Sequence, residues 1–448
     1  MKSVVVVGGG ISGILSALLL REKYPEVYLV EREAKLGGLL SSLHSPDGDS
    51  FDYGTHYLVN TGHEKIDSIL FPEEWRKDWI PLPFLKAGNY FQGRLNEQSM
   101  FPDTRLLPED VYRRGAEELL AIRTEPTAAK NLQEYLDGSF GRTFTKAVFE
   151  PIITTRLGLP LAELYTNGHI LINLTRILAF GPEETRKLKS ELPAYDRTIG
   201  FHSYLEGSRP AMSYYPKADG TSAWIDLLER RLHETGVKVL KGRTIRSIQH
   251  ESGEKITGVT LDNGDSMDCD AMFWTLPVSA FLKCCGLPTV VEPPKIRNTS
   301  HFHFVIDQPA DTELYYFLCH DATKLCYRVT LYSNVQQERV KKTGRYGISV
   351  EVLSGPIADV EEASKRILAE LVEMKAVPKS AKVLWKMARS GVSGIPVITP
   401  KFVEQTQRQM QALEGRFGNA YLSGMVPGVS FFKKEVLMQS YDQIRKLA

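Results

Sequence analysis

The beginning of the chain contains two short apolar runs separated by one long apolar run. Residues 4–7 are four valines and residues 27–30 read Val-Tyr-Leu-Val, which predicts two buried strands. Residues 11–20 are uncharged, mostly apolar and long enough for a helix. A strand, a helix and a second strand in this order predict a βαβ unit with parallel strands.

Three glycines in the first turn give this unit a specific chemistry. Gly8, Gly10 and Gly13 have the spacing Gly-x-Gly-x-x-Gly, and the second strand ends at Glu31. The first glycine permits a tight turn, the second lets a pyrophosphate approach the backbone, and the third lets the helix pack on the strand. The helix N-terminus around Ser12 offers N–H groups and a positive dipole end to phosphates. We therefore predict a dinucleotide site with Glu31 on a ribose hydroxyl.

The same apolar stretch has a second interpretation as a signal peptide or membrane anchor behind Lys2. Four glycines and two serines interrupt residues 4–20, however, and a membrane-spanning helix needs about 20 apolar residues. A signal peptide would also give the second strand no purpose. We expect a nucleotide-binding unit and no integral membrane segment.

The pattern changes character several times along the rest of the chain. Residues 107–180 are typical of helices, and residues 221–235 predict an amphipathic helix followed by short strands and a hairpin. Residues 299–354 are rich in predicted strands, and a helix is expected over about 360–375. The last predicted elements are a strand at 419–424 and a helix over about 432–447.

These segments predict an α/β fold of two interleaved domains. A chain of 448 residues is too long for one ordinary core. We expect residues 1–90, 212–278 and 380–448 to form a discontinuous nucleotide-binding domain. Residues 91–211, mainly helical, and 279–379, rich in strands, would form a substrate domain. Ligands commonly bind between two such domains.

Composition and charge exclude several partners and favour one compartment. The chain is 42% hydrophobic and 24% charged with a net charge of +1, so nothing indicates nucleic acid or an anionic membrane surface as a partner. No Ser-His-Asp set, acid/base carboxylate pair or metal-ligand cluster stands out. The odd number of cysteines without metal spacing favours a reducing, cytoplasmic location. They are Cys269, Cys284, Cys285, Cys319 and Cys326.

Three more motifs extend the nucleotide-binding pattern. Gly37-Gly38 follows the acidic residue, residues 51–56 read Phe-Asp-Tyr-Gly-Thr-His, and the last predicted strand ends at Gly424 before a helix. Together with the βαβ unit, these motifs resemble the flavin-dependent family of amine oxidases, protoporphyrinogen oxidases, phytoene desaturases and UDP-galactopyranose mutases. In that family the dinucleotide is FAD. The resemblance therefore implies a glutathione-reductase-like Rossmann domain that binds FAD in extended form.

The resemblance also implies which residues contact the FAD. Glu31 would hold the adenosine ribose, the Ile245 backbone would lie near the adenine, and Gly424 would lie near the pyrophosphate and ribityl chain. The full set of implied contacts is Gly8, Gly10, Ser12, Gly13, Glu31, Arg32, Gly37, Gly38, Leu39, Gly54, Thr55, His56, Ile245, Gly424 and Met425.

Within the family the mutase branch is the most similar. Residues 327–334 read Tyr-Arg-Val-Thr-Leu-Tyr-Ser-Asn and resemble a mutase segment whose arginine contacts the substrate diphosphate, which implies that role for Arg328. Two departures oppose this likeness. The mutase helix Pro-Tyr-x-x-Lys-x-Trp corresponds to residues 151–157, which lack its Tyr, Lys and Trp, and residues 425–428 are apolar or glycine where the family is polar.

Four residues are candidates for catalysis, each with a structural alternative. His56 would hydrogen-bond the flavin, or be an ordinary turn histidine. Arg328 would bind a diphosphate, or form a surface salt bridge. Arg416 would lie at the mouth of the site, or stabilise a turn. Tyr421 would contact substrate, or pack as a core aromatic residue.

Three classes of function follow from these observations. The first is a mutase-like isomerase that acts on a nucleotide sugar through flavin N5, with NAD(P)H as a possible reductant. The second is an FAD-dependent oxidoreductase, similar to amine oxidases or desaturases, that takes hydride from a less polar small molecule. The third is a flavin-binding protein without turnover. Arg328 and Arg416 favour the first class, whereas the missing mutase residues favour the second.

Overall fold

The first layer of the protein is a parallel five-stranded sheet. In the computed structural model, which describes residues 3–206, 212–251, 254–289, 292–413, 415–424 and 433–447, the strand order is β10-β2-β1-β14-β20. The bounds are β1 Ser3–Val7, β2 Glu26–Glu31, β10 Lys238–Lys241, β14 Ala271–Trp274 and β20 Ala420–Leu422. The predicted βαβ unit is confirmed, because β1 and β2 pair in parallel and α1 (Ile11–Arg21) connects them.

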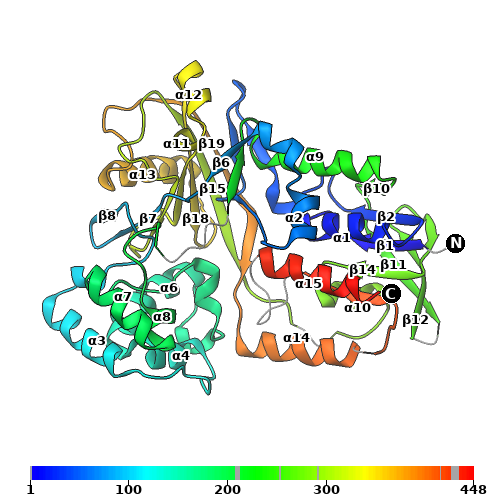
Figure 1. The fold of residues 1–448 in the computed structure, drawn as a ribbon, viewed down its shortest axis with the longest axis horizontal. Helices are drawn as coiled ribbons and strands as arrows, with labels where there is room; N and C mark the ends of the chain where they lie inside the picture. The colour runs from blue at the N-terminus through cyan, green and yellow to red at the C-terminus, as the bar shows by residue number, and fades with distance from the viewer. Residues whose placement is uncertain are drawn as a thin grey trace.

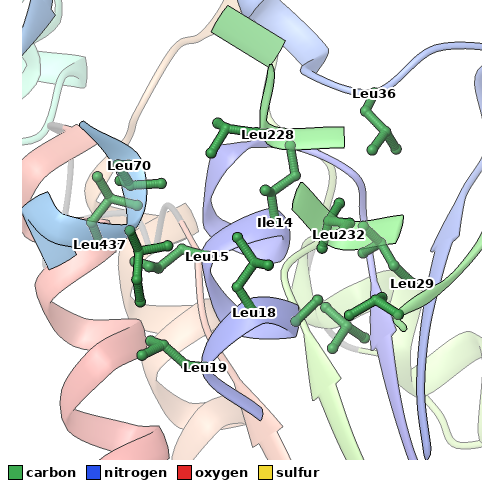
Figure 2. Packing of buried hydrophobic residues seen from close by; sticks show 14 of the residues in the cluster. Ile14, Leu15, Leu18, Leu19, Leu29, Leu36, Leu70, Leu228, Leu232 and Leu437 are labelled. Carbon is green, nitrogen blue, oxygen red and sulfur yellow. The ribbon is translucent and has the colours of Figure 1, made fainter. Parts of the chain in front are cut away.

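The side chains of β1 alternate between two hydrophobic cores. Val4 and Val6 pack in the core beneath α1, α9 (Gly220–Glu234) and α15 (Lys433–Arg445). Val5 and Val7 pack on the opposite face, against α10 (Val278–Cys284) and the small sheet β11 (Ile245–Glu251), β12 (Lys255–Leu261) and β13 (Ser266–Asp268). Figure 2 shows the leucine-rich packing between α1, α9 and α15. Because both faces of the sheet are covered, its central strands β1 and β14 are buried along their whole length.

A second, mostly antiparallel sheet lies beside the first (Figure 1). Its order is β19-β15-β18-β17-β16-β7-β8. The bounds are β7 Ala87–Phe91, β8 Arg94–Asn96, β15 Ile296–Ile306, β16 Tyr316–Cys319, β17 Arg328–Leu331, β18 Tyr346–Leu353 and β19 Val383–Pro396. Helix α13 (Val360–Glu373) packs with the core on one face of this sheet.

The domain boundaries differ from the predicted ones at two places. Strand β19 pairs with β15 along most of its length, so residues 383–396 belong to the second sheet rather than to the nucleotide-binding piece 380–448. Strand β7 also joins the second sheet, by pairing with β16, although the first predicted piece extended to residue 90. The expected boundaries missed both because strand partners are not visible in a local apolar pattern.

The predicted helical region forms a separate core beneath the second sheet (Figure 1). It contains α3 (Glu109–Ala121), α4 (Leu132–Phe140), α6 (Glu150–Leu157), α7 (Pro182–Glu191) and α8 (Pro193–Thr198). Short strands bridge the two sheets: β9 (Ser213–Pro216) pairs with β5 (Leu58–Val59) and β6 (Trp79–Leu82). Among the helices that the structure describes, none combines the length and hydropathy needed to cross a bilayer.

Candidate functional site

The glycine turn after β1 leaves open space in front of helix α1. Gly8 has φ +102°, a conformation that favours glycine, and a Cβ on Gly13 would overlap the Gly8 carbonyl oxygen. Gly10 differs from both, because a Cβ there would have no atom within 4 Å. Gly10 is also the N-cap of α1 and provides no side chain to cap it. The turn is thus closed on its strand side and open where a phosphate would meet the helix N-terminus.

The Glu31 carboxylate lies at the edge of this turn. Its Oε2 accepts a hydrogen bond from the Gly9 N–H at 2.6 Å, and its Oε1 accepts one from the Glu33 N–H at 2.7 Å. Both bonds fix the carboxylate at the carboxyl end of β2, the position that the Gly-x-Gly-x-x-Gly pattern gives to a ribose acceptor. The side chain of Arg32 is 77% exposed and pairs with Glu33.

The second glycine motif forms another wall of the same space. The Gly37 N–H donates to the Gly9 carbonyl at 2.8 Å, and Gly37 pairs with Gly10 as an isolated bridge. Gly38 begins the short 3₁₀ helix Gly38–Leu40, in which Leu39 is exposed. The predicted residues of the first two motifs therefore lie together at the carboxyl edge of the first sheet.

Two further predicted cofactor residues, Ile245 and Gly424, lie at the two ends of this edge. Strand β11 begins beside Glu31, because the Arg243 N–H donates to the Glu31 carbonyl at 2.9 Å, which brings Ile245 to the same end. Gly424 follows β20, and a Cβ there would lie 2.8 Å from the Thr275 carbonyl oxygen. Met425 lies outside the described residues.

A cluster of polar side chains surrounds Gly54, where residues 53–57, called the histidine loop below, meet the second sheet. A Cβ on Gly54, which has φ +103°, would lie 3.4 Å from Glu351 Oε2, 3.4 Å from His56 Nε2 and 3.5 Å from Arg328 Nη2. The Thr55 N–H donates to Glu351 Oε1 at 3.1 Å, and the Thr55 hydroxyl bonds that of Thr330. The histidine loop, β17 and β18 thus meet at one point.

Arg328 and Glu351 form a two-pronged ion pair at this point. Arg328 Nε and Nη2 each donate to one Glu351 oxygen at 2.6 Å, and Glu351 is only 4% exposed. Burial would raise the pKa of Glu351, but the charge and hydrogen bonds of Arg328 outweigh it and lower this pKa to about 2. Burial likewise opposes the charge of Arg328, while Glu351 raises its pKa. Both groups are therefore charged at neutral pH.

The histidines around this pair are held neutral. Burial, with smaller contributions from the charges of Lys433 and Arg328, lowers the pKa of His56 to about 3, and its Nε2 lies 3.0 Å from the Tyr53 carbonyl oxygen. His301 lies opposite Glu351 in the β15–β18 register, and burial lowers its pKa as well. Neither ring nitrogen of His301 has a hydrogen-bond partner among the described residues. His56 can therefore donate or accept a hydrogen bond but carries no charge at neutral pH.

The sequence pattern did not single out Glu351 or His301 as functional residues. A signal was present for Glu351, since it is the only charged residue in the otherwise apolar or small run 346–353. Charged residues are almost never fully buried unless they are paired. For His301 the decisive fact is its position opposite Glu351, which depends on strand register.

The structure places two predicted catalytic residues away from this group. Arg416 precedes β20, at the amino end of the parallel sheet, where its guanidinium lies 5.8 Å from the Phe417 ring centre. Tyr421 stacks on Phe273 at 5.3 Å, and its hydroxyl donates toward the Gly418 carbonyl, also at the amino end. Cofactor and substrate residues gather at the carboxyl end, so neither Arg416 nor Tyr421 lies with His56 and Arg328.

The helix that corresponds to the mutase Pro-Tyr-x-x-Lys-x-Trp segment is α6. Its only cation, Arg156, is fully buried and donates to backbone carbonyls of residues 319, 321, 325 and 326. Arg156 therefore holds the loop between β16 and β17 and is not available to a ligand. The wall beside the histidine loop is aromatic instead: the Tyr57 ring lies 5.9 Å from Tyr316 and 5.8 Å from Tyr215.

Comparisons with known proteins agree with this geometry. Residues 6–70 match the family described as NAD(P)-binding Rossmann-like domain. The chain is 23% identical over 288 residues to an all-trans-retinol 13,14-reductase of Rattus norvegicus, which covers 59% of this chain and 45% of the relative. It is 25% identical over 289 residues to a 4,4'-diapolycopen-4-al dehydrogenase of Metabacillus indicus, with 60% and 54% covered. The chain thus spans about half the length of these relatives.

Solved structures extend the likeness to the whole chain. A reduced UDP-galactopyranose mutase superposes with a TM-score of 0.76 at 18% identity, covering 100% of this chain and 94% of that one. A putative protoporphyrinogen oxidase from Exiguobacterium sp. 255-15 superposes with a TM-score of 0.69 at 15% identity, covering 100% and 98%. At these identities the likeness establishes the two-domain fold and not the reaction.

Proposed function

Because the chain belongs to the FAD/NAD(P)-binding Rossmann superfamily that includes UDP-galactopyranose mutase, protoporphyrinogen oxidase and carotenoid-desaturase-like enzymes, we propose that it is an FAD-dependent oxidoreductase of a substrate less polar than a nucleotide sugar. The two-pronged Arg328–Glu351 pair carries this proposal. A diphosphate needs unneutralised cations, and the guanidinium expected to bind it already has a carboxylate partner. Removing one partner of a buried pair costs about 3–5 kcal/mol, so a phosphate would have to overcome that loss.

The residues of the glycine turns fit FAD. The open space at Gly10 and the uncapped start of α1 suit a pyrophosphate, and Glu31 already accepts two hydrogen bonds where a ribose would offer its hydroxyls. When bound, the flavin would supply hydride acceptance at N5. The neutral His56 would orient the ring or substrate by a hydrogen bond, and the Tyr57–Tyr316 wall would exclude water from an apolar substrate.

The relatives that align over more than half of this chain support the same substrate class. Their names refer to a retinol and a diapolycopenal, an alcohol and an aldehyde that each carry a long hydrocarbon chain. The second candidate is the mutase reaction on a nucleotide sugar, favoured by the whole-chain fold likeness to the reduced mutase. The two candidates differ in the charge that the substrate brings to Arg328.

One purified preparation tests both candidates. The protein should carry a yellow flavin spectrum, and a polyene alcohol or aldehyde in detergent should bleach it under anaerobic conditions. UDP should show no saturable binding, either to wild type or to Arg328→Met, and Arg114→Met, at an exposed position on α3, serves as the matched control. The oxidoreductase proposal is wrong if the enzyme instead isomerises UDP-galactopyranose after chemical reduction and loses UDP affinity only in Arg328→Met.

We further propose that the protein works in a reducing, cytoplasmic compartment. All five cysteines are unpaired, and burial raises the pKa of each thiol. Buried neutral thiols are inert and need no oxidising environment. Cell fractionation of a tagged full-length chain tests this location.

A further inference from the structure

Helix α15 reaches beyond α1 toward the second domain. The two helices run in parallel, because the Ser12 hydroxyl lies 2.9 Å from that of Ser440 and Lys23 Nζ donates to the Ile444 carbonyl at 3.0 Å. Ser12 is in the first turn of α1, whereas Ser440 lies about two turns into α15. At 1.5 Å per residue, α15 therefore begins about 9 Å further toward the second domain than α1 does.

The first residue of α15, Lys433, lies beside the histidine loop. Its Nζ is 3.5 Å from the Tyr57 carbonyl oxygen and 5.9 Å from the Trp224 ring centre. The side chain is half-buried, and burial lowers its pKa to about 8. Its neighbour Lys434 is exposed. No carboxylate of the described residues forms an ion pair with Lys433, and a partly buried ammonium without a counter-charge is costly.

The other basic residues around the histidine loop offer no unbalanced charge to a ligand. His56 is neutral because of its lowered pKa. The charge of Arg328 is matched by Glu351 at 2.6 Å. Among the described residues around the histidine loop, Lys433 thus contributes the positive charge that no carboxylate balances. Lys433 lies beyond the N-terminus of α1, on the side of the second domain. A dinucleotide anchored at Gly10 would extend its far end toward this place.

We propose that Lys433 balances the negative charge that a bound flavin gains on reduction and thereby raises the reduction potential of the flavin. The inference rests on the proposed function, since it requires bound FAD. A flavin that takes up two electrons and one proton carries one negative charge. Lys433 forms no bond with it and keeps its own proton. A positive charge near the ring is one of the means by which a protein tunes flavin electronics.

The test compares Lys433→Met with Lys434→Met, which removes the same charge from the exposed neighbour. FAD content and FAD affinity are measured first, followed by the midpoint potential in dye equilibration and by titration with sulfite, an anion that adds to oxidised flavin. Lys433→Met should keep its FAD but favour the reduced over the oxidised form about tenfold less, which is about 30 mV for a two-electron couple. Its sulfite affinity should fall in parallel. Lys434→Met should match wild type, and Lys433→Arg should restore both values.

Three results would overturn the proposal. The first is an unchanged potential and sulfite affinity in Lys433→Met. The second is loss of FAD from Lys433→Met alone, which would make Lys433 a ligand of the FAD phosphates. The third is a change only in the KM of an anionic substrate. If Lys433→Met does not fold, judged by circular dichroism, Lys433→Gln takes its place. A wild-type protein without flavin would instead refute the proposed function itself.

Discussion

The Asp52 carboxylate joins the strand that leads into the histidine loop to the first turn of helix α9: its Oδ1 accepts a hydrogen bond from the Thr221 N–H at 2.9 Å. The same oxygen accepts the Ser42 hydroxyl at 2.7 Å, and Oδ2 accepts the Tyr215 hydroxyl at 2.8 Å. Asp52 has no exposed surface, and the Thr221 and Tyr215 donors are buried with it. One buried side chain thus fixes the loop that presents His56 against the nucleotide-binding domain.

Replacing Asp52 should therefore destabilise the whole protein. Asp52→Ala leaves several buried donors without acceptors, and we expect the free energy of unfolding to fall by about 3–5 kcal/mol. Urea titration followed by tryptophan fluorescence measures it. Asp226→Ala, an exposed position on α9, should change the value by less than about 0.5 kcal/mol. Equal effects of the two substitutions would mean that the Asp52 bonds contribute no net stability.

Two glycines of the first turn should separate stability from binding. Gly13→Ala places a Cβ on the Gly8 carbonyl oxygen and should lower thermal stability, because backbone has to move. Gly10→Ala meets no atom within 4 Å and should leave stability nearly unchanged. The methyl group would nevertheless occupy the space open to a pyrophosphate, so FAD affinity should fall about tenfold or more, or about 1.4 kcal/mol. Thermal unfolding without FAD and FAD titration test the pair; normal FAD affinity in Gly10→Ala would contradict the site.

Gly54 should be sensitive to crowding as well as to backbone strain. Gly54→Ala forces a left-handed conformation, at about 1–3 kcal/mol, and presses its methyl group toward Glu351, His56 and Arg328. Gly264→Ala has a similar φ of +92° but no atom within 4 Å, so it carries the strain alone. We expect Gly54→Ala to lose more stability than Gly264→Ala in urea titrations. Only Gly54→Ala should alter the visible spectrum of the bound flavin.

Acid should weaken the protein through its buried histidines. Burial lowers the pKa of His303 to about 3, whereas an unfolded histidine has a pKa of about 6.5. Between these values only the unfolded state binds the proton, so stability is fully present above about pH 6.5 and is lost as the pH falls toward 3. From pH 7 to pH 5 this residue should cost about 2 kcal/mol. His303→Asn should reduce the loss by that amount in urea titrations, and an unchanged pH dependence in this variant would contradict the prediction.

The parts of the candidate site that depend on a local sequence pattern could be predicted. The parts that depend on which strands pair could not. The four valines, the glycine spacing and Glu31 lie within one continuous segment, and the structure assembles them as predicted. Arg328 was correctly assigned to a strand, but its partner Glu351 lies 23 residues away and meets it only through the β17–β18 register. No local pattern contains that register.

Arg416 and Tyr421 illustrate the same limit from the other direction. Arg416 precedes the strand that was correctly predicted near the end of the chain, and Tyr421 belongs to it. Strand β20 runs parallel to β14, so the residues that precede it lie at the amino end of the sheet. His56 lies toward the opposite end, which explains its distance from both residues. Motif likeness alone gave them a catalytic role that strand direction does not support.

The order of strands β10-β2-β1-β14-β20 has a consequence for how the protein is made. The outermost strand, residues 420–422, and the helix that packs on α1, residues 433–445, are synthesised more than 400 residues after β1. Domains fold during synthesis only when their parts have emerged from the ribosome. Until β20 and α15 have been synthesised, one flank of the sheet and helix layer around the turn Gly8–Gly13 therefore remains uncovered. This interval is almost the whole of translation. Under the proposed function, FAD therefore binds only after almost the whole chain has been synthesised.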